Sequence, residues 1–241
     1  MTQFKLIHDK EDSELALFFW FVGFKGSIYR PPTPGNFPEP PPPKYDIDLS
    51  FRDVSSNLRF AVMASSEYRL KNTTFRTSFS SLVFKGKAFV PADLIFQNIN
   101  YRVGYFAGDL SAGKSLLSHD KIRIDGLIGF KWTHMSIRGE SDLIGTQPFE
   151  GNREHWWLDP LIGVDILYSP LERLEFHAYG DIGALVGSEL TFQLIGEANY
   201  YINSWFYLTY GYRVWGLKVD PEQAIYEGQI KGMVLRLGFL L

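Results

Sequence analysis

The chain has 241 residues, a net charge of −3, 45% hydrophobic residues and no cysteine. A charge this close to neutral does not indicate a nucleic-acid partner. The lack of cysteine excludes disulfides, thiol catalysis and cysteine-bound zinc. The aromatic share of 16% is higher than we expect of a soluble enzyme.

The N-terminus begins with a polar segment, 1–13, that lacks the features of a signal peptide. It has no basic start before an apolar stretch and no A-x-A cleavage site. No apolar run in the chain reaches the roughly 18 residues that a transmembrane helix needs. The longest, LALFFWFVGF at 15–24, instead has the length of a transmembrane β-strand.

A proline-rich stretch follows the first predicted strand, 14–30. PPTPGNFPEPPPP at 31–43 holds eight of the 13 prolines, which predicts a stiff, extended and solvent-exposed loop over 31–44. The next predicted strand, 45–69, changes the parity of its apolar residues between Phe51 and Phe60. We therefore expect a bulge or a short helical turn over 52–58.

Alternating apolar and polar residues dominate the rest of the chain. In LTFQLIGEANYY, for example, Leu190 and Phe192 share one parity while Thr191 and Gln193 share the other, which indicates a strand. A slip in parity at Gly232 suggests a second bulge. The further predicted strands are 72–88, 94–109, 120–138, 152–168, 171–186, 189–202, 204–219 and 225–241. The count is about ten strands, and eight or twelve would also satisfy the pattern.

Short links between long strands predict an antiparallel up-and-down barrel, and two kinds of barrel can bury such strands. Soluble barrels and sandwiches have strands of about five or six residues, whereas these run to ten or more. Aromatic residues such as Tyr168, Tyr200 and Trp205 lie near strand ends, as in the girdles of outer-membrane barrels. We predict an all-β transmembrane barrel formed by one domain, 14–241, with a soluble lipocalin-like barrel as the alternative.

Three motifs in the second half of the chain carry a resemblance. They are D-P-x-x-G-x-x-x-x-Y from Asp159, G-D-x-G-x-x-x-G-S-x-L-T-x-Q from Gly180, and G-Y-R from Gly211. With the segment 48–69, they resemble a widespread group of small, OmpA- or OmpW-like outer-membrane β-barrel proteins. The resemblance implies a porin-like architecture and a place in the outer membrane of a Gram-negative bacterium, and it implies no activity.

Charged residues of both signs recur on the polar face of the predicted strands, as expected where charges neutralise one another away from bulk water. A barrel of about ten strands is narrow, so we expect these residues to fill most of the lumen. The protein would then be structural or a channel for small solutes. The predicted lumen network is Arg102, Arg123, Asp125, Lys131, Asp159, Asp165, Glu175, His177, Asp181, Glu197 and Arg213.

The stretch GDLSAGKS at 108–115 matches the P-loop pattern, in which Gly108, Gly113, Lys114 and Ser115 would bind a nucleotide phosphate. A P-loop needs a helix of about ten residues after it. Only LLSHD, 116–120, precedes the next predicted strand. We interpret the match as false and expect a periplasmic turn, with no nucleotide or other cofactor.

Two further functions are weaker alternatives. Glu175, His177 and Asp181 share one strand face and could serve a hydrolase as general acid and base, but they lie in mid-strand, so we do not predict an enzyme. The five histidines are scattered, and no metal site is predicted. In the second alternative, the protein is a surface adhesion module that binds a protein partner through the loops 31–44 and 139–151. Apart from such a partner, we expect a monomer in contact with outer-membrane lipid.

Overall fold

A computed structural model describes residues 12–29, 44–88, 96–143, 149–184, 188–218 and 226–241. These residues form eleven strands and one short helix. The elements are β1 (Asp12–Tyr29), β2 (Lys44–Leu49), α1 (Phe51–Asn57), β3 (Leu58–Leu70), β4 (Thr73–Ala88), β5 (Phe96–His119), β6 (Ile122–Leu143), β7 (Phe149–Leu171), β8 (Leu174–Gly183), β9 (Leu190–Tyr201), β10 (Phe206–Lys218) and β11 (Tyr226–Leu240).

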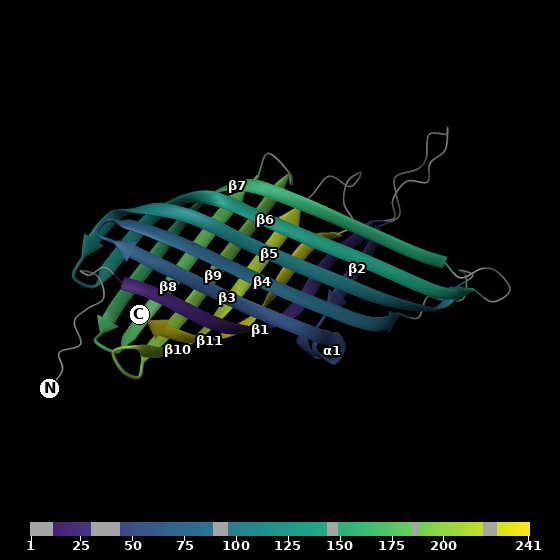
Figure 1. Ribbon diagram of the computed structural model, residues 1–241, viewed down its shortest axis with the longest axis horizontal. Coiled ribbons are helices and arrows are strands. Elements are labelled where there is room, and N and C mark those ends of the chain that lie inside the picture. Colours follow the sequence, from purple (N-terminus) through teal and green to yellow (C-terminus); the bar gives the residue numbers. More distant parts are fainter. Residues whose placement is uncertain (1–11, 30–43, 89–95, 144–148, 185–187, 219–225) are drawn as a thin grey trace.

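The strands form a closed antiparallel barrel (Figure 1). From β3 to β11 each strand pairs with the next along the chain, and β11 closes the barrel on β1 from Glu14↔Leu240 to Ile28↔Tyr226. β2 and β3 both lie beside β1, one along each half, so eleven strands occupy ten positions in the wall. This confirms the predicted antiparallel barrel of about ten strands.

The two ends of the barrel differ. The start of β1 and the end of β11 lie at one end, which we call the terminal end, together with the short links 71–72, 120–121, 172–173 and 202–205. At the opposite end β5, β6 and β7, of 24, 22 and 23 residues, extend beyond the other strands (Figure 1). The helix among the described residues, α1, has seven residues, and no described helix is long and apolar enough to cross a membrane.

The outer face of the wall is apolar and the inner face is mixed. In β8, Phe176 and Ile182 face outward and are exposed, whereas Glu175, His177 and Asp181 face inward and are buried. β4 and β9 follow the same alternation, and on β6 Ile128 is 69% exposed on the outer face. An exposed apolar outer face is what a bilayer requires of a transmembrane barrel.

The predicted turn at 108–115 is wrong, because these residues lie inside β5. They pair with β4 from Gly108↔Phe79 to Lys114↔Thr73 and also with β6, and the actual turn is at 120–121. The glycines serve packing between strands. A Cβ at Gly108 would lie 2.3 Å from the Trp132 indole, so glycine lets that ring lie across the strand.

Three other predictions concern irregular segments. The helical turn expected at 52–58 is α1, which begins with a capping box between Ser50 and Asp53. The bulge expected at Gly232 is wrong, since β11 pairs on both sides without a register shift. The predicted loop 139–151 is largely strand, because β6 continues to Leu143 and β7 begins at Phe149. The loop 31–44 lies outside the described residues except for Lys44.

Candidate functional site: the barrel interior

Ten of the eleven predicted network residues are buried inside the barrel. They are Arg123, Asp125, Lys131, Asp159, Asp165, Glu175, His177, Asp181, Glu197 and Arg213. The eleventh, Arg102, is exposed, so its assignment to the lumen is wrong. β5 turns Tyr105 and Asp109 inward instead, each 2% exposed, and Arg102 lies opposite Lys85 on the outer face. β5 does alternate as predicted, but its two faces are exchanged: the face with Tyr105 points into the lumen and the face with Arg102 points outward.

A chain of alternating charges crosses the middle of the lumen. His177 lies between two carboxylates, with Nε2 2.9 Å from Asp165 Oδ1 and Nδ1 3.2 Å from Glu197 Oε2. Arg76 donates to Asp165 at 3.0 Å and Arg236 donates to Glu197 at 2.9 Å. These five residues come from β4, β7, β8, β9 and β11, so the chain ties five strands together across the lumen. We call it the charge ladder.

Further ion pairs and hydrogen bonds surround the ladder. Arg123 contacts Asp125 at 2.8 Å, and Lys131 pairs with Asp181. Toward the terminal end, Glu175 accepts hydrogen bonds from Asn199 at 3.1 Å and from the Tyr201 hydroxyl at 3.2 Å. These contacts provide the buried charges with partners, as a stable low-dielectric interior requires.

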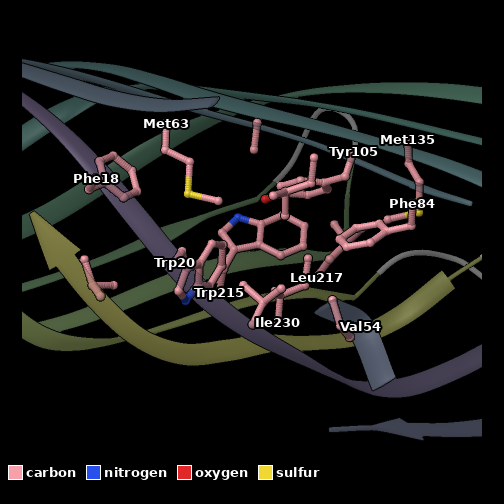
Figure 2. Close-up of a cluster of buried hydrophobic side chains, with 14 of the residues drawn as sticks. Phe18, Trp20, Val54, Met63, Phe84, Tyr105, Met135, Trp215, Leu217 and Ile230 are labelled. Carbon is pink, nitrogen blue, oxygen red and sulfur yellow. The ribbon is translucent and has the colours of Figure 1, made fainter. Parts of the chain in front are cut away.

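Apolar side chains fill the other part of the lumen (Figure 2). We call them the aromatic cluster: Phe18, Trp20, Val22, Val54, Met63, Leu82, Phe84, Tyr105, Ala107, Met135, Trp157, Trp215, Leu217, Ile230 and Val234. Trp215, 1% exposed, meets the Tyr105 ring edge-on with centroids 5.2 Å apart. The Arg213 guanidinium lies 4.8 Å from the centroid of the Trp20 ring, which joins the polar and apolar parts by a cation–π contact.

Sequence reasoning missed several of these residues for identifiable reasons. Asp109 lies within the false P-loop match. In β11 the odd-numbered face before Gly232 is the more polar one, whereas Ile230 and Val234 share the inner face with Arg236. Phe18 and Trp20 lie in a strand that is apolar on both faces, so alternation gave no signal there.

The chemistry available to this interior is limited by the contacts its groups already make. Both ring nitrogens of His177 face carboxylates, and the side chain is 7% exposed. Among the described residues, no group of three His, Asp or Glu side chains is arranged to hold a metal ion. The buried polar groups around His177 are therefore engaged with one another.

Comparison with known proteins bears on the fold. No protein-family model matches the chain, and no curated protein matches its sequence. The outer-membrane protease OmpT from Escherichia coli is similar in structure, with a TM-score of 0.54 and 9% identity over 98% of this chain and 97% of that one. At this identity the likeness shows the fold alone: the chain has the fold of an outer-membrane β-barrel.

Two other proteins are also similar over most of their length. The attachment invasion locus protein Ail of Yersinia pestis has a TM-score of 0.36 and 9% identity, with 96% of this chain and 99% of that chain covered. Neisserial surface protein A has a TM-score of 0.34 and 10% identity, with 95% and 96% covered. These TM-scores are too low to support any inference about this chain.

Proposed function

We propose that this protein is an outer-membrane β-barrel whose lumen is closed to axial flow, with a structural role and at most slow passage of small solutes. The observation that carries the proposal is the filling of two successive levels of the lumen. The charge ladder spans one level and the aromatic cluster occupies the next. A barrel of ten positions is narrow enough for side chains to close it in this way.

The outer face supports a place in a membrane. Phe19 is 61% exposed, Ile128 69% and Leu194 55%, and they lie on three different parts of the wall. Near the terminal end, Tyr168, Tyr200 and Trp205 are also exposed. An apolar belt that ends in aromatic residues matches the bilayer interior and its interface.

An enzymatic role is less well supported, although OmpT is a protease. A general base must be within reach of its substrate's proton. His177 is buried between Asp165 and Glu197 in the middle of the lumen. The adhesion alternative depends on the loop 31–44, almost all of which lies outside the described residues, and we do not develop it.

Planar-bilayer recording tests the proposal. The wild-type protein should give no stepwise conductance. The triple variant Trp215→Ala/Arg213→Ala/His177→Ala removes side chains from both levels and should give discrete steps. It leaves Asp165 paired with Arg76 and Glu197 paired with Arg236, so the barrel should still fold.

The control is Trp205→Ala, which removes an exposed indole from the outer face and should give no conductance steps. Heat-modifiable migration on SDS gels checks that each variant folds. Frequent ohmic steps from the wild-type protein would show an open pore and contradict the proposal.

A further inference from the structure

The barrel wall has a break between β1 and β3. β3 pairs with β1 only from Asp12↔Arg69 to Leu17↔Ala64, and β2 pairs with it only from Phe24↔Leu49 onward. Residues 18–23 of β1 and 58–63 of β3 therefore have no strand partner on the edges that face each other. All of these residues are described, so the break is a feature of the wall itself.

Exposure changes at the same place. In β3 the residues 59–62 are exposed on both faces, whereas in the facing stretch of β1 the inward residues Phe18, Trp20 and Val22 are buried. Phe60 and Val62, on the outer face, are 51% and 39% exposed. Beside the break on β1, Phe19 is 61% exposed. The break thus opens within the apolar belt of the outer face.

Helix α1 fills this break. Its buried residue, Val54, belongs to the aromatic cluster inside the barrel. On the outer side, the Phe51 ring meets the Phe21 ring edge-on with centroids 5.3 Å apart. Its other side chains from Arg52 to Ser56 are exposed. A helix of seven residues that lacks a ladder of backbone hydrogen bonds to its neighbours is easier to displace than a paired strand.

A hollow on the outer surface lies beside α1, over β1, β11 and β10. It has a volume of about 320 Å³, and its lining includes Phe21 of β1, Ser50, Phe51 of α1, Tyr212 of β10 and Met233 of β11. Such a volume is at the lower end of the range for small-molecule sites, roughly 300–1,000 Å³. Phe51 of α1 lines this hollow, and Val54 of the same helix belongs to the aromatic cluster, so α1 contacts both.

The aromatic cluster offers unused hydrogen-bond donors. The indole N–H groups of Trp20 and Trp215 have no acceptor among the described residues, although the two side chains are only 5% and 1% exposed. Figure 2 shows both indoles in the cluster to which Val54 of α1 also belongs. Buried indole N–H groups normally have a partner. A ligand that brings an acceptor oxygen would supply one.

We propose that the break between β1 and β3 is a lateral portal, with α1 as its stopper, through which a small aromatic molecule bearing a hydrogen-bond acceptor passes from the membrane to the aromatic cluster. Unpaired backbone groups are costly in hydrocarbon unless protein covers them or they line a cavity. α1 provides that cover when the portal is closed. The portal lies in the side wall, so it is independent of whether the lumen conducts along its axis.

A tether across the portal tests the proposal. Phe21→Cys/Phe51→Cys is joined by a short bis-maleimide, and the lack of native cysteine makes the site unique. The probe is 4-bromophenol, whose bromine quenches tryptophan fluorescence, added to protein in liposomes. In a background that carries Trp132→Phe, Trp156→Phe and Trp205→Phe, which removes the outer-face indoles, we expect saturable quenching in the untethered variant and at least ten-fold slower quenching in the tethered one. Phe206→Cys/Phe239→Cys, with rings 5.4 Å apart at the terminal end, is the matched control and should quench at the untethered rate.

A second pair of variants keeps the proposal falsifiable if the tether impairs folding. Trp20→Phe and Trp215→Phe keep an aromatic ring but remove the N–H donor. Loss of one hydrogen bond should weaken 4-bromophenol binding roughly three- to ten-fold and leave bromobenzene, which has no acceptor oxygen, unchanged. Equal quenching rates with and without the tether, or equal losses for both probes, would overturn the proposal.

Discussion

Two lysines show how position in the wall decides the role of a side chain. Lys131 is 1% exposed and pairs with Asp181 across the lumen, whereas Lys114 is exposed on the outer face of β5. The sequence predicts the same difference, because alternation assigns Lys131 to the lumen network and Lys114 lies in a P-loop match interpreted as false. The buried pair braces the interior, and the exposed lysine is solvated.

Replacing each lysine by methionine tests this difference. Lys131→Met leaves Asp181 buried without its cation, and breaking a buried pair in this way costs about 3–5 kcal/mol. Lys114→Met should change stability by no more than about 0.5 kcal/mol. Urea unfolding of the folded protein measures both. Adding Asp181→Leu to Lys131→Met should restore most of the lost free energy of unfolding, because no buried carboxylate is then left without a cation. If stability is not restored, the loss does not come from the broken Lys131–Asp181 pair.

Sequence alternation predicted single residues well where a strand has one apolar and one polar face. It placed His177 and Glu197 on the inner face of β8 and β9 because their neighbours alternate without a break. It failed for Arg102, because Val103 and Tyr105 looked suited to lipid and in fact pack into the lumen. Alternation identifies two faces, and the residue types alone do not always show which face is inside.

At the scale of elements, closure of the barrel depends on the contact between β1 and β11. Gly232 of β11 lies opposite Val22 of β1, and a Cβ there would be 1.8 Å from the Phe21 carbonyl oxygen. Because the Phe21 carbonyl and Gly232 belong to paired strands, neither can move without disturbing the backbone hydrogen bonds between β1 and β11. The glycine that suggested a bulge is therefore required by close approach of the backbones.

Gly232→Ala should destabilise the barrel more than ordinary overpacking, which costs about 1–3 kcal/mol. Gly196→Ala on β9 is the matched control, since a Cβ there meets nothing within 4 Å. The fraction that keeps heat-modifiable migration after folding into detergent measures the effect. A normal folded fraction for Gly232→Ala would mean that the contact between β1 and β11 is looser than the structure indicates.

At the scale of the whole molecule, strand count and closure followed from sequence because each strand is long and regular. The aromatic cluster did not follow, because Phe18, Trp20 and Trp215 meet only when β1 and β10 curve around one lumen. The break filled by α1 could be located from the parity change between Phe51 and Phe60. The sequence did not show that the wall is interrupted at this place, because only the pairing of β1 with both β2 and β3 reveals the interruption.

The central claim is a membrane-spanning barrel with a filled interior, and thiol reactivity tests it most directly. Single cysteines at Thr133, Ile128 and Asp120 represent the lumen, the lipid-facing wall and a link at the terminal end; Thr133 is 1% exposed and Ile128 69%. With a charged, water-soluble methanethiosulfonate and protein in liposomes, the account predicts rapid reaction of Asp120→Cys alone, and reaction of all three after unfolding. Reaction of folded Thr133→Cys or Ile128→Cys at the rate of Asp120→Cys would contradict it, because the lumen would then hold water or the wall would not face lipid.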